Sequence, residues 1–165
     1  MKSTNKIKSF IIMMITCSAI LISCKKSDPN PSATNLDPGK SQISCTVAGA
    51  VSSSFSTSTL VSTAIKNASL MNISGSNTTL PIQLMLFIIP TNITVGSHNL
   101  STDDEFTVSY TNDTKGWAAG NVGDNFTLVV TKNDGTLFEG TFSGTLTNDD
   151  GTSVTITNGK IAAKF

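Results

Sequence analysis

Apolar and polar residues alternate between Ser41 and Phe165, and this period of two is typical of β-strands rather than helices. Turn signals of hairpin type separate the runs, notably Asn133-Asp134-Gly135, Asp149-Asp150-Gly151 and Asn158-Gly159. We therefore predict an all-β domain, an antiparallel β-sandwich or flattened barrel of about 8 to 10 strands. The alternating apolar positions are Ile43, Cys45 and Val47; Met71 and Ile73; Ile82, Leu84, Leu86 and Ile88; Phe106, Val108 and Tyr110; Phe126, Leu128 and Val130; Phe138, Phe142 and Leu146; Val154 and Ile156; and Ile161, Ala163 and Phe165.

Two segments depart from the simple alternation. In Leu80 to Ile89 the residues of the other parity, Met85, Phe87 and Ile89, are apolar as well, which predicts a central strand covered on both faces. In Thr136 to Thr147, Gly140 and Gly144 share the face of Phe142 and would let a backbone or a large ring approach closely.

The first 23 residues have the character of a signal peptide. Three lysines precede an uncharged apolar run from Phe10 to Ile22. A helix of that length reaches about 20 Å, which is less than the roughly 30 Å of a bilayer's hydrocarbon core. A cleaved export signal is therefore a better interpretation than a transmembrane anchor.

The apolar run ends in a tetrad, Leu21, Ile22, Ser23 and Cys24, that resembles the lipobox of bacterial lipoproteins. The resemblance implies that Cys24 is the first mature residue and that its sulfur carries the lipid. Two or three acyl chains, palmitate among them, would hold the protein on a membrane. Lysines follow Cys24, rather than the aspartate that retains some lipoproteins in the inner membrane, so we expect the outer membrane, in its periplasmic or external leaflet.

Composition then divides the chain into three parts. Residues 1–23 are the expected signal peptide, and residues 24–40 are the lipidated cysteine and a flexible tether rich in Pro, Ser, Asn and Asp. As a coil this tether spans roughly 20 to 25 Å. Residues 41–165 form the single all-β domain, where Ser, Thr and Asn make up 48 of 125 residues and suit sheet surfaces and turns.

Charge and cysteine content exclude several classes of protein. The 165 residues have a formal net charge of zero, and all eleven cationic side chains are lysines, so the arginine fork for nucleic-acid contacts is missing. One histidine and one unacylated mature cysteine are too few for a zinc site, and we expect no metal and no cofactor. That cysteine, Cys45, falls in register with Ile43 and Val47, which predicts a buried side chain.

Catalytic candidates are few. His98 is the only histidine, no GxSxG motif occurs, and the densest acidic cluster is Asp103, Asp104 and Glu105. Neither this cluster nor Asn148-Asp149-Asp150-Gly151 has the spacing of a calcium loop. We expect a non-enzymatic protein, and the alternative is a hydrolase that uses His98 with Asp103, Asp104 or Glu105.

Binding candidates are aromatic residues and the neutral surface. Trp117, with Tyr110 nearby, could contact a ligand such as a sugar ring, or could be a core residue. Ser41 to Thr102 has a single charged residue, Lys66, whereas Asp103 to Phe165 has a net charge of −5. A surface of neutral hydroxyls and amides is compatible with docking of a glycan or a protein, and equally with solubility alone.

The sequence also resembles a family of small, uncharacterised Gram-negative lipoproteins with a β-rich domain of unknown function. The resemblance rests on Gly140 to Ser143, Asp150-Gly151, Val154 to Gly159 and the closing Ile161 to Phe165, and more weakly on Ile43 to Gly49. It implies a fold and no mechanism. The sequence thus predicts an outer-membrane lipoprotein with a non-catalytic binding or structural β-domain; the alternatives are the hydrolase and a lipocalin-like carrier of an apolar ligand.

Overall fold

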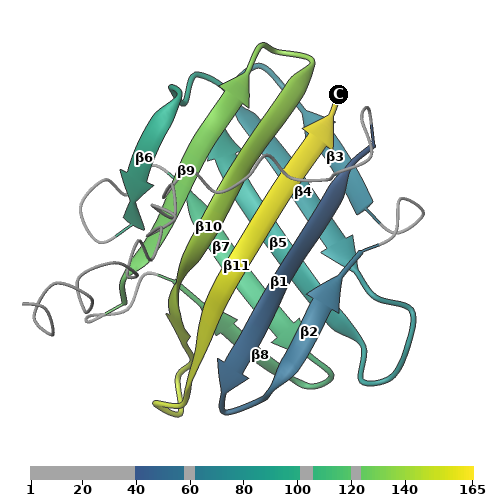
Figure 1. The fold of residues 1–165 in the computed structure, drawn as a ribbon, viewed down its shortest axis with the longest axis vertical. Coiled ribbons are helices and arrows are strands. Elements are labelled where there is room, and N and C mark those ends of the chain that lie inside the picture. The colour runs from purple at the N-terminus through teal and green to yellow at the C-terminus, as the bar shows by residue number, and fades with distance from the viewer. Residues whose placement is uncertain (1–39, 58–61, 101–105, 120–123) are drawn as a thin grey trace, which may run out of the picture. The chain divides into compact units, whose positions relative to one another are not determined.

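The computed structural model describes residues 40–57, 62–100, 106–119 and 124–165 of a compact unit spanning Ala33–Phe165. Within these described residues, eleven strands, all paired in antiparallel fashion, form one curled sheet (Figure 1). The predicted all-β antiparallel class is confirmed, with 11 strands where about 8 to 10 were expected. The strands are β1 (Gln42–Gly49), β2 (Ser53–Ser56), β3 (Ser62–Lys66), β4 (Leu70–Ser76), β5 (Gln83–Pro90), β6 (Gly96–Asn99), β7 (Thr107–Asn112), β8 (Lys115–Ala118), β9 (Phe126–Asn133), β10 (Leu137–Thr147) and β11 (Ser153–Lys164).

The sheet folds over into two facing layers whose strands cross (Figure 1). The front layer has the order β2-β1-β11-β10-β9-β6, and the back layer has the order β8-β7-β5-β4-β3. Strand β10 belongs to both layers, because it pairs with β9 from Phe138 to Gly144 and with β8 at Thr147. The two layers are therefore continuous at β10.

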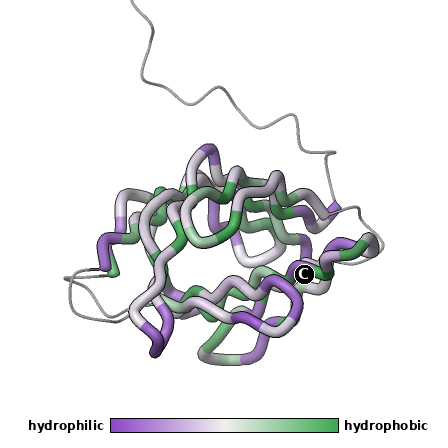
Figure 2. Tube along the Cα trace, turned by 90° about the horizontal axis from the view of Figure 1, so that it is seen from below, coloured by the Kyte–Doolittle hydropathy of each residue, from purple (hydrophilic) through white to green (hydrophobic). Residues whose placement is uncertain are grey.

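The core lies between the layers and consists of alternating residues of the strands. In Figure 2, hydrophobic residues (green) recur along the backbone between hydrophilic ones. Aromatic rings fill much of it. The Phe87 ring contacts the Phe142 ring edge-on at a centroid distance of 4.9 Å, and Phe126 stacks on Phe142 at 6.0 Å. Burial of these rings supplies a large part of the hydrophobic stabilisation, since each removes about 150–250 Å² from water.

The prediction for Leu80 to Ile89 is half correct. Strand β5 is central, between β4 and β7. Its inward residues are Met85, Phe87 and Ile89, all fully buried, whereas Leu84 is 40% exposed on the outer face. The expectation of a strand covered on both faces was wrong, because both parities are apolar but only one faces the other layer.

Asn158-Gly159 is not a hairpin turn, contrary to the sequence interpretation. Both residues lie inside β11, where the register with β1 and β10 shifts. Asn158 adopts a φ of 54°, which asparagine tolerates, and the ring of Phe142 lies over Gly159 where a side chain would otherwise be. The predicted close approach at Gly140 and Gly144 is confirmed, since Gly140 lies against the carbonyl of Val129 and Gly144 against the backbone of Asn125 and Phe126.

The sandwich has two ends, named here by the limits of β1. At the Gln42 end, Phe165 N donates a hydrogen bond to Thr136 O at 3.0 Å, so the last residue lies beside the β9–β10 turn. At the Gly49 end, Gly49 pairs with Val154, next to the β10–β11 turn. The predicted turns around Gly135 and Gly151 are confirmed, one at each end.

Candidate functional site

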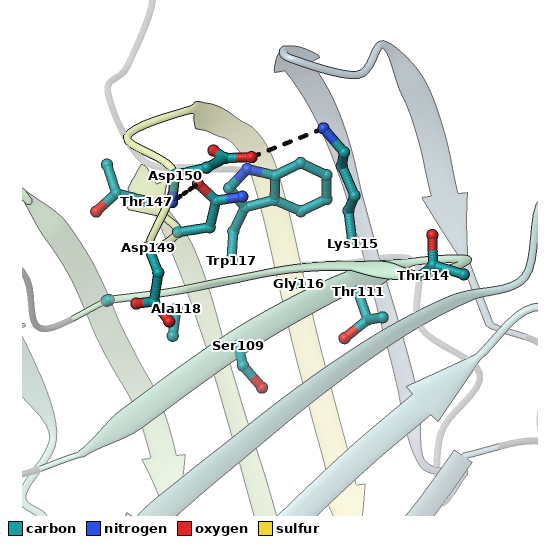
Figure 3. A pocket seen from close by; sticks show the side chains of 12 residues that line it. Ser109, Thr111, Thr114, Lys115, Gly116, Trp117, Ala118, Thr147, Asp149 and Asp150 are labelled. Atoms are coloured by element: carbon teal, nitrogen blue, oxygen red, sulfur yellow. Dashed lines mark hydrogen bonds and ion pairs between the residues drawn. The ribbon is translucent and has the colours of Figure 1, made fainter.

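A groove opens at the Gly49 end, where β8 and β10 diverge (Figure 3). These two strands pair at Ala118 and Thr147, beyond which β10 leads into the turn at Asn148. The groove has a volume of about 750 Å³. Its lining residues are Ser109, Thr111, Thr114, Lys115, Gly116, Trp117, Ala118, Ala119, Thr147, Asn148, Asp149 and Asp150.

The β10–β11 turn forms one wall of the groove and is held by side-chain hydrogen bonds. Asn148 Oδ1 accepts from the backbone N–H of Asp150 at 3.2 Å and from that of Thr152 at 3.1 Å. Gly151, with a φ of 78°, supplies the left-handed residue that the turn needs. These bonds fix the positions of the groove's two carboxylates, Asp149 and Asp150.

Asp150 faces Lys115 across the groove. Its Oδ2 lies 3.8 Å from Lys115 Nζ, and both side chains are more than half exposed, so the ion pair adds little stability. Hydrogen bonds from the hydroxyl and backbone N–H of Thr152, with the charge of Lys115, hold the pKa of Asp150 below its usual range. Asp150 is therefore an anionic acceptor at neutral pH.

The opposite wall is the β7–β8 hairpin, which contributes small side chains. Ser109 pairs with Ala118, and Thr111 pairs with Gly116. A Cβ atom added at Gly116 would meet only Thr111 Oγ1, at 3.7 Å, so the space above this glycine is open. In Figure 3, Ser109 and Thr111 point to one side of β8, and Trp117 and Lys115 to the other, so the groove passes around the edge of β8.

The free edge of β8 presents backbone groups to the groove. Ala119 N donates to Val108 O at 3.1 Å, which shows which residues of the β7–β8 ladder exchange hydrogen bonds. Because antiparallel ladders alternate, the peptide groups of Gly116 and Ala118 point away from β7 and toward β10; Ala118 pairs with Thr147 there, and the groups of Gly116 face the groove. The groove thus combines hydroxyls, one amide, two carboxylates, one ammonium group and main-chain groups.

The two aromatic residues named as candidate ligand contacts occupy different places. Trp117 lines the groove but is 1% exposed, and its Nε1–H donates to Thr152 Oγ1 at 3.3 Å. Tyr110 stacks on Trp117 at a centroid distance of 5.9 Å, is fully buried and does not line the groove. The Trp117 ring is therefore a wall of the groove and not an open platform on which a sugar could stack.

Cys45 is buried, as its register predicted, with 6% of its surface exposed. Burial raises the pKa of its thiol to about 12. The side chain acts as a small apolar group of the core rather than as a nucleophile.

His98 lies on the edge strand β6 and is 9% exposed, with Nε2 at 2.9 Å from Thr94 O. Asp103, Asp104 and Glu105, its expected partners in a hydrolase, are outside the described residues. In the part of the chain that the structure describes, no three His, Cys, Asp or Glu side chains gather into a metal site.

Sequence reasoning missed the small residues of the groove and the buried acid Asp124. Asp124 is 7% exposed, and its Oδ1 accepts from the hydroxyl of Thr147 at 2.7 Å, which orients one groove residue. The local sequence pattern does not identify Ser109, Thr111 or Gly116 as site residues. They lie near the β10–β11 turn only because β8 pairs with β10, which are far apart in the chain.

Leu21, Ile22, Ser23 and Cys24 of the lipobox, and the tether before Lys40, lie outside the described residues. Residues 40–57, 62–100, 106–119 and 124–165 include no helix with the length and hydrophobicity of a membrane span. Comparison of the chain with family models, curated proteins and solved structures found no match.

Proposed function

We propose that this protein is an outer-membrane-anchored lipoprotein whose non-catalytic β-domain binds an uncharged polar ligand, a glycan, in the groove at its Gly49 end. The observation that carries the proposal is the position of the groove. The tether precedes β1 at the Gln42 end, and the eight residues of β1 extend about 25 Å before the chain reaches Gly49. The tether therefore joins the domain at the end opposite to the groove.

The lining chemistry supports a hydroxyl-rich ligand. Ser109, Thr111, Thr114 and Thr147 offer hydroxyls that both donate and accept, and Asn148 offers an amide. The carboxylates of Asp149 and Asp150 accept from ligand hydroxyls, while the single ammonium of Lys115 is already near Asp150. Two carboxylates and one ammonium group give this set a net negative charge, which disfavours a phosphate as the ligand.

The alternatives have less support in the described residues. A carrier needs an open apolar interior, whereas the rings of Phe87, Phe126 and Phe142 contact one another between the layers. A hydrolase built around His98 would lie on β6, in a part of the front layer that does not line the groove.

Anchoring is tested by Cys24→Ala in the full chain expressed in a Gram-negative host. The wild type should incorporate labelled palmitate and lose residues 1–23, because the acylated thiol is the substrate for cleavage. The variant should stay unlabelled and unprocessed. Normal processing of Cys24→Ala would contradict the lipoprotein assignment.

Ligand binding is tested by fluorescence, because Trp117 is the chain's only tryptophan and forms a wall of the groove. Detergent-solubilised protein should change its emission on titration with neutral oligosaccharides, chitotetraose and maltotetraose, at millimolar concentration or below. Gly116→Val fills the open space and should abolish the change, whereas Thr155→Val, exposed on β11, should not. An unchanged response in Gly116→Val, or no response of the wild type to either sugar, would contradict the proposal.

A further inference from the structure

The outer face of the back layer carries an apolar ridge along β5. Leu84, Leu86 and Ile88 point outward. Ile82 O accepts from Asp113 N, and Ile82 N–H donates to the Asp113 carboxylate. These bonds continue the register of β5 with β7 and place Ile82 on the same face as Leu84. Ile82 is 52% exposed and Leu84 is 40% exposed. Leu80, next along the chain, is 83% exposed.

The ridge broadens toward the Gln42 end. Ile88 lies opposite Asn72 on β4, which in turn lies opposite Ile65 on the edge strand β3. Ile65 is 60% exposed, and Leu70, on the same face of β4, is exposed as well. Among the described residues, six large hydrophobic side chains are exposed, and this face holds four of them with Leu80 adjoining.

Uncharged polar side chains flank the ridge on both sides. Asn72, Ser74 and Ser76 stand on β4, and Thr107, Ser109 and Thr111 stand on β7, opposite the ridge residues. Ser109 and Thr111 also line the groove, so the groove borders this face. No outward residue of β4, β5 or β7 is charged. The nearest carboxylate, that of Asp113, accepts from the N–H of Ile82 at one end of the ridge, so like-charge repulsion does not oppose packing about the middle of the face.

The size of the face fits a specific protein contact. Five strands spaced about 4.8 Å apart and about six residues long on average give a footprint of roughly 500 Å². Two such faces bury about 1,000 Å² in total, which is near the lower limit for a biological interface. An apolar centre with a polar rim is also the composition of such interfaces.

We propose that the outer face of the back layer is the interface of a symmetric dimer, in which the β5 ridges of two copies pack against each other. Sheets pack face to face in this way at about 10 Å, and an isologous contact needs a self-complementary surface. A lipid bilayer is the other apolar occupant. It is less suited, because the face presents neither the lysines nor the aromatic side chains of membrane-surface elements.

The dimer is tested by cross-linking in membranes from cells that express the full chain. Leu86 lies at the middle of the ridge, opposite Ser74 on one side and Ser109 on the other, so a two-fold axis through the middle of the ridge would pass near it. Leu86→Cys should give a band of twice the monomer mass with a short bis-maleimide. Thr155→Cys, exposed on the outer side of the front layer, is the matched control and should give about tenfold less.

A second variant separates loss of the dimer from loss of the fold. Leu84→Lys in the Leu86→Cys background places two like charges at the interface, and at 40% exposure the site tolerates lysine. It should lower the dimer yield about tenfold or more with an unchanged thermal transition. Equal cross-linking of Leu86→Cys and Thr155→Cys would overturn the dimer. The dimer would also be overturned if the protein stays monomeric and added lipid vesicles protect Leu86→Cys from reaction with maleimide.

Discussion

Tyr110 donates a hydrogen bond from its hydroxyl to Gln83 Oε1 across 2.8 Å, at a site where both side chains are buried. Ser53, on β2 of the front layer, donates to the same oxygen at 3.0 Å. The Gln83 side chain thus joins the two layers at the Gly49 end, beneath the turns that surround the groove. A buried amide oxygen with two donors is a specific contact between layers that apolar packing alone would not provide.

Tyr110→Phe removes one donor from Gln83 and leaves the ring stacked on Trp117. We expect the free energy of unfolding to fall by about 1–2 kcal/mol, because a buried acceptor loses a partner. Urea denaturation measures this change, and Ser54→Ala, on the exposed side of β2, is the control. A loss below about 0.5 kcal/mol would mean that the bond is not important for stability.

Gly159→Ala tests the contact with the Phe142 ring. The added Cβ would overlap both the ring and the Phe142 carbonyl, so we expect a loss of about 3 kcal/mol or more. Gly116→Ala makes the same change on a strand with open space and should alter stability by less than about 1 kcal/mol. Equal effects in the two variants, measured by thermal unfolding, would disprove the close approach.

Cys45 should resist maleimide in the native protein at pH 8 and react once urea unfolds the chain. The folded thiol stays protonated because burial raises its pKa to about 12. Stability linked to this group is fully present below pH 9 and is lost as pH rises through about 12, since the unfolded thiol ionises first. Thr155→Cys gives the exposed comparison, and equally fast native labelling of Cys45 would place it at the surface.

Asp134 should make the stability sensitive to acid. Backbone hydrogen bonds from Thr136 and Leu137, then the Thr136 hydroxyl and Lys132, hold the pKa of Asp134 well below its usual range. A lowered pKa gives stability that is present above about pH 4 and is lost as pH falls through the folded value.

Asp134→Asn should therefore unfold at a lower temperature than the wild type at pH 7, and the difference should shrink toward pH 2. Thermal scans at pH 7, 4 and 2 measure it, with Asp149→Asn in the β10–β11 turn as the control. A difference that stays constant with pH would show that the charge of Asp134 does not stabilise its turn.

Local pattern predicted most of the strands but not the role of every face. In β7, Val108 and Tyr110 alternate with polar residues, so the sequence indicates which face of the strand is buried, and the structure buries both residues. In β5 both parities are apolar, so the sequence could not say that Phe87 faces inward while Leu86 faces outward. The choice depends on which face meets the other layer, and that is decided by strands far away in the chain.

The candidate site was less accessible to sequence reasoning. Trp117 was singled out because it is the only tryptophan, yet its neighbours in the groove are common small residues. The Asn158-Gly159 pair has the composition of a turn, but continued pairing with β1 and β10 makes it a bulge within β11. In both cases the long-range register determines what the local residues do.

The antiparallel pairing of β1 with β11 also has a mechanical consequence. Gln42 and the β10–β11 turn lie at opposite ends of this strand pair, which runs from Gln42↔Ala162 to Gly49↔Val154. If the protein is anchored and binds its ligand as proposed, tension between the membrane and a load held at Asp149 would pull the two strands along their length in opposite directions. The ladder hydrogen bonds run perpendicular to that pull and would share the force in shear, instead of opening one after another as in a zipper.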